Sequence, residues 1–563
     1  MILLALALAT QAQTIQTGLW SYDTVYNTGA HGALTVTHDA SGWKARIAGH
    51  EMSFTPAGDS VRFGSVDSSG AFRGAFTIGR QTIDGFWVQP HSVWYDQYFT
   101  TPLELPRSGA ETWRGTVTPL EDRLTLYLAI QRGADSALVA VFRHPQANAF
   151  GRGLRYGVST SGDSVYFVAP ANQRRPEVRI AGAYDRASQT ITIKWPILDQ
   201  PTVLRPQAPE KAVSFYPRLP RGAKYVYRPP PRLNDGWDVG RLRDVGFEET
   251  ALARLVQSIV DTDPAGPQAP LIHSMLVARQ GRLVLEEYFF GSDRTQPHDT
   301  RSLGKTFGSV MLGGAMLEGD PIAPESLLVP TSDDPRKARI TLANVLTHTT
   351  GLACDDNDDN SPGNEDVMQS QTKQPDWWRY TLDLPMVNDP GTHAAYCSGG
   401  MNLTGYMLTR ATRTWLPALF ERTVARPLGF GRWYWNLMPT QEGYQGGGAR
   451  LLPRDLLKIG VAYLNGGEWH GKRIVSREWT ARSTVNQVAP GVGTDGYAWH
   501  LGNIKVGERA YREYEGNGNG GQFLIVVPEV DLAVVFTAGD YLDYGVWGQF
   551  RNVLVADMIR ALR

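Results

Sequence analysis

Apolar and polar residues alternate in short runs through the first two fifths of the chain. Gly, Asp, Ser and Asn interrupt these runs about every ten residues, which is typical of antiparallel strands joined by tight turns. The clearest runs are residues 33–37, 60–63, 123–128 and 190–195. We therefore expect residues 14–206 to be all-β.

This β region contains similar segments. The sequence GDSVRF at residues 58–63 recurs as GDSVYF at residues 162–167. We predict two tandem β repeats, at residues 14–108 and 109–206, each forming a small sheet or barrel. A single β domain with chance similarities is the alternative.

The pattern changes after the β region. Residues 207–240 are rich in proline, with three in succession at 229–231. Successive prolines hold a chain extended, so we predict a linker. From residue 241, helical periodicity appears, and residues 248–260 are amphipathic. Strand-like runs occur near both ends of the remaining sequence, with helical segments between them. This order predicts an α+β domain over residues 241–563.

Length and charge exclude several classes of protein. A chain of 563 residues is too long for one core and suggests about three domains. Its 55 basic and 56 acidic residues give a net charge of −1, so nothing favours nucleic acid or an anionic membrane as a partner. No apolar run reaches the roughly 18–20 residues of a transmembrane span.

The first residues resemble a secretory signal peptide. Residues 1–12 are a short apolar stretch that ends in small residues, as before a cleavage site. The first basic side chain is Lys44. Either the amino terminus alone supplies the usual positive charge, or the natural start lies upstream. A buried first strand is the alternative. We expect a periplasmic or secreted protein.

A serine and a lysine three residues apart form the first chemical motif. Ser302 and Lys305 open an apolar helix, where residues i and i+3 share one face. A lysine in that position can take the serine proton. The same spacing occurs at residues 41–44, in a predicted hairpin, and at 370–373, in a polar stretch. By itself, an ordinary surface Ser and Lys is an equal alternative.

Two further segments carry polar groups suited to a cleft. Tyr396 and Ser398 follow a Pro-Gly turn and precede a helix. Residues 515–522, EGNGNGGQ, lead directly into a strand, and their glycines allow a ligand to approach the backbone closely. A simple hairpin turn is the alternative for this segment.

In this order, the three segments resemble the serine β-lactamase and penicillin-binding-protein superfamily, specifically its class C-like and esterase branch. Residues 340–352, ITLANVLTHTTGL, and 444–451, YQGGGARL, resemble further family segments. The resemblance covers residues 241–563. It implies a β-lactamase-like α+β domain, with an antiparallel sheet, flanking helices and a helical lobe.

The resemblance also implies roles for individual residues. Ser302 would be the nucleophile, and Lys305 and Tyr396 a coupled acid–base pair in which the proton is assigned to neither. The backbone N–H groups of Ser302 and Gln522 would form the oxyanion hole. His348 would be structural. The implied substrate contacts are Ser398, Asn519, Gly520 and Gly521. The resemblance implies no cofactor and no metal ion.

The strand-edge triplet departs from the family. Asn519-Gly520-Gly521 stands where the lactamases and peptidases have a lysine and a hydroxyl residue. We therefore predict a serine esterase or amidase for small uncharged acyl substrates. A β-lactamase or D-Ala-D-Ala carboxypeptidase is the alternative if Arg450 or Arg512 supplies the missing charge. An inactive lobe that binds cell wall or a partner is another, with the β region contacting glycan.

The two cysteines, Cys354 and Cys397, both lie in segments that border the active site in this family. In an oxidising compartment such a pair tends to be bridged, so we predict one disulfide. Two free buried thiols are the alternative. The acidic run at residues 355–360 lacks the glycine and distal glutamate of a calcium loop, which favours a solvated loop.

Overall fold

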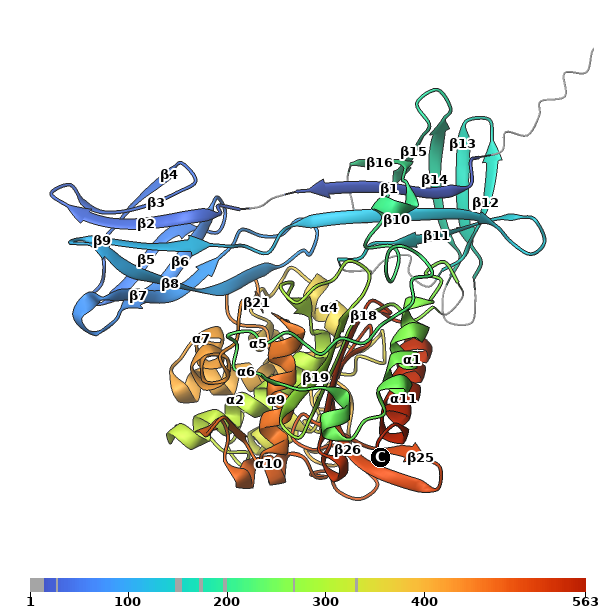
Figure 1. Ribbon diagram of the computed structural model, residues 1–563. Helices are drawn as coiled ribbons and strands as arrows, with labels where there is room; N and C mark the ends of the chain where they lie inside the picture. The colour runs from blue at the N-terminus through green and yellow to red at the C-terminus, as the bar shows by residue number, and fades with distance from the viewer. Residues whose placement is uncertain are drawn as a thin grey trace, which may run out of the picture.

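The computed structural model describes residues 15–26, 29–146, 154–171, 176–195, 200–266, 269–329 and 333–563. The predicted signal peptide, residues 1–12, lies outside this range. None of the helices in these segments is both long and apolar enough to span a membrane. Figure 1 shows an elongated β region lying across one side of a mixed α+β domain.

The N-terminal region is all-β, as predicted, and one half of it is a closed eight-stranded barrel. Buried aromatic residues such as Trp20, Phe142 and Trp195 fill its interior. Its strands are β1 (Gly18–Val25), β10 (Arg123–Arg132), β11 (Leu138–Arg143), β12 (Tyr156–Ser161), β13 (Ser164–Ala169), β14 (Val178–Asp185), β15 (Thr190–Lys194) and β16 (Pro201–Pro206).

The other half is a sheet formed by the residues between β1 and β10. Its core includes Phe72, Trp87 and Trp113. The strands are β2 (Gly32–Asp39), β3 (Gly42–Ile47), β4 (His50–Phe54), β5 (Ser60–Ser65), β6 (Gly70–Phe76), β7 (Thr82–Val88), β8 (Tyr98–Gly109) and β9 (Thr112–Val117).

This topology differs from two tandem repeats divided between residues 108 and 109. That boundary falls inside β8, and β1 pairs with β10 along its whole length, from Gly18↔Ile130 to Val25↔Arg123. The first strand therefore closes the barrel of the second half. Alternation of apolar residues shows which face of a strand is buried but not which strand is its partner.

The C-terminal domain is built on a seven-stranded sheet, in the order β17-β19-β18-β28-β27-β26-β25. Its strands come from both ends of the domain, as the sequence predicted. They are β17 (Asp238–Val239), β18 (Ile272–Arg279), β19 (Arg282–Tyr288), β25 (His500–Val506), β26 (Arg509–Gly518), β27 (Gln522–Val527) and β28 (Leu532–Ala538).

Helices cover both faces of this sheet (Figure 1). One face packs on α1 (Glu249–Val260) and α11 (Tyr544–Arg560). The other packs on α9 (Pro453–Leu464) and α2 (Gly304–Glu318), beyond which lies a helical lobe. The lobe and its surroundings contain α3 (Leu342–Leu346), α4 (Glu365–Ser370), α5 (Trp377–Asp383), α6 (Ser398–Thr412), α7 (Leu416–Phe420), α8 (Arg426–Leu428) and α10 (Arg477–Ser483).

The two regions share a sheet and a core. Strand β8 pairs with β21 (Tyr434–Leu437), which continues to β22 (Ala449–Leu451) and β20 (His298–Asp299). Phe86 of β7 packs edge-on against Trp415 and Trp433, at ring-centroid distances of 5.3 and 6.1 Å. The β region therefore supports the strands that lead to residue 299, just before Ser302.

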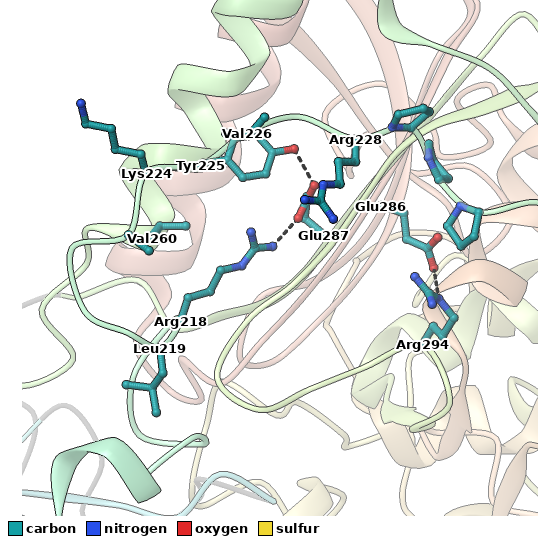
Figure 2. Close-up of a pocket in the computed structure, with 14 residues that line it drawn as sticks. Arg218, Leu219, Lys224, Tyr225, Val226, Arg228, Val260, Glu286, Glu287 and Arg294 are labelled. Atoms are coloured by element: carbon teal, nitrogen blue, oxygen red, sulfur yellow. Dashed lines mark hydrogen bonds and ion pairs between the residues drawn. The ribbon is translucent and has the colours of Figure 1, made fainter.

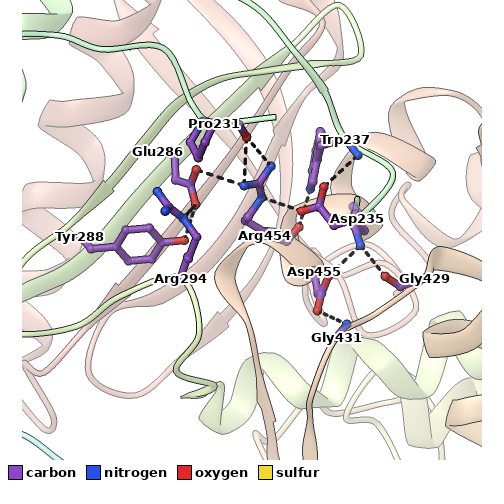
Figure 3. Close-up of polar contacts among 11 residues, drawn as sticks. Pro231, Asp235, Trp237, Glu286, Tyr288, Arg294, Gly429, Gly431, Arg454 and Asp455 are labelled. Carbon is purple, nitrogen blue, oxygen red and sulfur yellow. Dashed lines mark hydrogen bonds and ion pairs between the residues drawn. The ribbon is translucent and has the colours of Figure 1, made fainter. Parts of the chain in front are cut away.

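The proline-rich segment is a strap on the C-terminal domain. Arg218 forms an ion pair with Glu287 of β19, and Tyr225 donates its hydroxyl proton to the same carboxylate (Figure 2). This part of the strap borders a cavity of about 600 Å³. Farther along, Trp237 Nε1 donates to the Arg454 carbonyl, 3.1 Å away (Figure 3). These contacts fix residues 207–240 against the sheet, so they do not act as a free spacer.

Candidate active site

Ser302 and Lys305 face each other at the start of α2. Ser302 lies in a 3₁₀ turn, Arg301–Leu303, which continues directly into the helix. Lys305 Nζ donates to Ser302 Oγ at 2.8 Å, and it also donates to the carbonyl oxygen of Gly446. Lys305 is only 4% exposed. The structure therefore places a buried ammonium in contact with the serine hydroxyl.

Tyr396 completes this group. Its ring centroid lies 5.0 Å from Lys305 Nζ. Burial lowers the pKa of Lys305, but the nearby Tyr396, Glu365 and Asp356 outweigh burial and raise that pKa above its usual value. The three residues predicted for acid–base chemistry, Ser302, Lys305 and Tyr396, are therefore together.

Backbone contacts on both sides hold Tyr396, which precedes α6 in an irregular segment. Asp356 N donates to the Tyr396 carbonyl at 2.8 Å, and the His348 ring packs at a tilt against the Tyr396 ring with centroids 4.8 Å apart. The next residue, Cys397, is bridged to Cys354, as predicted, and its N–H donates to His348 Nδ1 at 3.2 Å. His348 therefore has the structural position that the resemblance implied.

Ser398 does not contact Lys305 through a hydrogen bond. Its hydroxyl donates to Glu365 Oε2 at 3.2 Å, and its backbone N–H donates to Asp356 Oδ2 at 2.8 Å. Tyr444 donates to the other oxygen of Glu365. Ser398 is fully buried, so its hydroxyl has no open surface in this structure. The hydrogen bonds of Ser398 hold the start of α6 and the Glu365 carboxylate in place near Lys305. The sequence did not reveal this role.

The strand edge beside Ser302 is formed by the end of β26. A Cβ on Gly518 would lie 2.3 Å from the Thr300 carbonyl oxygen and 3.0 Å from Leu303 N, so only glycine fits there. This places residues 517–519 next to the serine turn. Asn519 lies at this edge, and its side-chain oxygen accepts a hydrogen bond from Leu542 N at 2.7 Å.

The other predicted strand-edge residues lie farther along the hairpin. Gln522 begins β27, and its buried side chain donates to the Ala538 carbonyl at 2.7 Å. Gly521 packs against α11, where a Cβ would lie 2.9 Å from the Phe550 ring. Gly520 forms a bridge with Asp540. Closely spaced glycines give this hairpin several equivalent registers, and Gly518 is the glycine that touches the serine turn.

Neither arginine named from the sequence as a substitute cation is available. Arg450 is buried between Asp299, at 3.4 Å, and the Tyr95 ring, at 4.2 Å. Arg512 lies far along β26, where its N–H donates to Glu529. Besides Lys305, a second cation next to the serine is Arg301, inside the first motif. Its position in the sequence, directly before Ser302, was the signal that sequence analysis missed.

A chain of hydrogen bonds links this site to the barrel. His298 Nδ1 lies 3.0 Å from the Asp299 carbonyl oxygen, which can only accept, so this nitrogen donates. In neutral His298, Nε2 then accepts from His273 Nδ1, 2.8 Å away. His273 Nε2 in turn accepts from Arg143, a barrel residue 3.4 Å away. Every ring nitrogen of the two histidines takes part in a hydrogen bond, and neither ring can take a further proton without losing one of these hydrogen bonds.

We expect acid to weaken folding through these histidines. Burial lowers the pKa of His298 from 6.5 to about 4 and that of His273 well below its usual value. Between about pH 6.5 and about pH 4, the unfolded chain binds protons on these histidines that the folded chain does not bind. The free energy of unfolding should therefore fall as the pH drops below about 6.5, by up to about 1.4 kcal/mol per pH unit for each histidine.

Urea unfolding between about pH 7.5 and about pH 4.5 tests this expectation. The variant His298→Gln should show a shallower loss of stability with acid than the wild type. Identical slopes for the two proteins would show that His298 does not titrate as described.

The fold and these side chains define a class of protein, an α+β domain with a Ser–Lys–Tyr group at one edge of its sheet. Residues 272–541 match the family model described as Beta-lactamase, so the C-terminal domain is similar to this family. No match was found among curated proteins.

Solved structures with similarity to the chain include three hydrolases. A putative 6-aminohexanoate-dimer hydrolase from Bacillus anthracis is 19% identical, covering 52% of this chain and 81% of its own, with a TM-score of 0.44. A family VIII carboxylesterase is 17% identical, with coverages of 58% and 99% and a TM-score of 0.43. A class C β-lactamase mutant is 16% identical, with coverages of 56% and 97% and a TM-score of 0.41.

Proposed function

We propose that this protein is a serine hydrolase that cleaves small esters or amides through an acyl-enzyme on Ser302. The observation that carries the proposal is the 2.8 Å hydrogen bond from Lys305 Nζ to Ser302 Oγ, with Tyr396 beside the same ammonium. A serine is a weak nucleophile unless a neighbouring group accepts its proton, and we assign this task to the Lys305–Tyr396 pair in the state in which one of its two members is deprotonated.

In the proposed reaction, Ser302 Oγ attacks the substrate carbonyl carbon while its proton passes to the Lys305–Tyr396 pair. The pair returns a proton to the leaving alcohol or amine as the carbon–oxygen or carbon–nitrogen bond breaks. Water then attacks the acyl-enzyme, and the acid and the free serine are released. We assign the proton to neither residue of the pair alone.

The oxyanion that forms during each attack needs backbone donors. Ser302 N–H at the beginning of α2 is one, as the family resemblance implied. We assign the second to the end of β26, at residues 517–519, in place of Gln522, because this strand end approaches the serine turn. Two such donors stabilise the negative charge where it develops.

The substrate class follows from the same strand end. Its residues are Asn517, Gly518 and Asn519, which carry no charge. A β-lactam brings a carboxylate close to the scissile bond, and burying it there without a cation forgoes a charged hydrogen bond worth about 1.5–3 kcal/mol. A neutral ester has no such requirement. This difference favours esterase or amidase activity over β-lactamase activity.

We expect kcat/KM for p-nitrophenyl butyrate to exceed that for nitrocefin by about 100-fold, since about 3 kcal/mol of transition-state binding is missing for nitrocefin. Both chromogenic substrates can be measured on one preparation. Nitrocefin turnover equal to that of the ester would show that the cleft binds the lactam carboxylate at the strand edge after all.

A further inference from the structure

Arg301 is a cation next to the proposed nucleophile that the reaction described above does not use. It directly precedes Ser302, and its backbone φ of +49° lies in the left-handed region, which is unfavourable for a residue with a side chain. Asp299 Oδ1 holds this conformation by accepting a 2.9 Å hydrogen bond from Arg301 N. The direction in which the Arg301 side chain leaves the backbone is therefore fixed.

Two guanidinium groups share one carboxylate at this point. Asp299 Oδ2 lies 3.2 Å from Arg301 Nε and 3.4 Å from Arg450 Nη2. Among the residues that the structure describes, neither arginine has another carboxylate within 4.0 Å. This cluster therefore carries one positive charge in excess, close to Ser302.

The side chains of the two arginines differ in solvent exposure. The side chain of Arg450 is 7% exposed and lies against the Tyr95 ring of the β region, and it lines a cavity whose walls do not include Ser302 or Lys305. The side chain of Arg301 is 36% exposed. Its guanidinium carbon lies 4.9 Å from the centroid of the Tyr541 ring, which supports one face. Asp299 lies on the Nε side, and Tyr541 also forms a side-chain hydrogen bond with the guanidinium, which has further N–H donors.

The acidic residues near the site have other partners. The two oxygens of Glu365 accept hydroxyl hydrogens from Tyr444 and Ser398. The two oxygens of Asp356 accept backbone hydrogens from Glu365 and Ser398. Neither carboxylate forms an ion pair with Arg301, although Glu365 and Asp366 attract its guanidinium at longer range.

We propose that Arg301 is a specificity-determining residue that binds a carboxylate on the substrate, a few bonds from the scissile carbonyl. The inference rests on the proposed function, since it names the substrate class of the same site. A guanidinium binds a carboxylate through two parallel N–H donors, and partial burial strengthens such a pair. The expected substrate is therefore no longer uncharged. Its carboxylate binds beside Ser302 and not at the strand edge.

Three esters test this assignment. 4-Nitrophenyl hexanoate is neutral, mono-4-nitrophenyl adipate carries a carboxylate on the acyl side, and 4-carboxyphenyl hexanoate carries one on the leaving group. For each ester, kcat/KM is measured for the wild type and for Arg301→Gln and Arg301→Lys, after subtraction of spontaneous hydrolysis. Comparing variants on one ester cancels differences in leaving-group reactivity.

We expect Arg301→Gln to lower kcat/KM about 10- to 100-fold for at least one anionic ester. The fold-loss for the neutral ester should be at least about ten times smaller. Arg301→Lys should recover part of the loss, because it keeps the charge but not the two parallel N–H donors. An equal loss on all three esters would show that Arg301 only supports the serine turn and would overturn the inference. Hydrolysis of none of the esters by the wild type would instead overturn the proposed function.

Discussion

Replacing Ser302 with alanine is expected to lower kcat/KM for p-nitrophenyl butyrate by about 10,000-fold or more. The reason is that the acyl-enzyme cannot form without the Oγ that accepts a hydrogen bond from Lys305 at 2.8 Å. The loss should appear in kcat, since the remaining cleft still binds the ester. Steady-state kinetics at matched protein concentration measure this effect.

The chain contains a matched control for this substitution. Ser370 precedes Lys373 with the same spacing, but it ends the short helix α4, where its hydroxyl lies near the Val367 carbonyl. Ser370→Ala should leave kcat/KM unchanged within about twofold, because exposed sites of this kind contribute little. A Ser302→Ala variant that kept wild-type activity would remove Ser302 from the mechanism.

Replacing Tyr396 with phenylalanine is expected to reduce kcat by about 100- to 10,000-fold, the range for loss of a general acid–base group. This variant keeps the ring that packs against His348 and lies beside Lys305, so it removes only the phenol oxygen. The KM should change much less than kcat. The pH profile of kcat should also change shape, because one member of the coupled pair is missing.

Tyr406→Phe is the corresponding control. Tyr406 lies on α6, and its ring packs edge-on against Trp378 with centroids 5.7 Å apart. Its loss of a hydroxyl should not affect kcat beyond about twofold. If Tyr396→Phe and Tyr406→Phe were equally active, the proton would pass through Lys305 alone.

The parts of the site that sequence analysis predicted are those fixed by local spacing. Ser302 and Lys305 share one face because they are three residues apart at the beginning of a helix. The link between Cys354 and Cys397 followed from their being the only two cysteines, in segments expected to border one cleft. In the same way, strands near both ends of the C-terminal domain indicated an α+β fold.

The parts that it missed depend on contacts between distant residues. The closure of the barrel by β1 depends on its pairing with β10, which no local pattern specifies. The contact between Ser398 and Glu365 joins residues 33 positions apart. The strand end beside Ser302 was not identified uniquely because several glycines offer equivalent registers. Arg301 lay inside the motif, but only the tertiary structure shows that it shares Asp299 with Arg450.

Covalent labelling of Ser302 is the most direct test of the central claim. A fluorophosphonate probe reacts with an activated serine, whose Oγ attacks phosphorus and displaces fluoride. We predict that the wild type gains one probe mass, that peptide mapping places it on Ser302, and that Ser302→Ala gains none while Ser370→Ala labels as the wild type does. A folded wild type that gains no probe, or a label that persists in Ser302→Ala, would contradict the account.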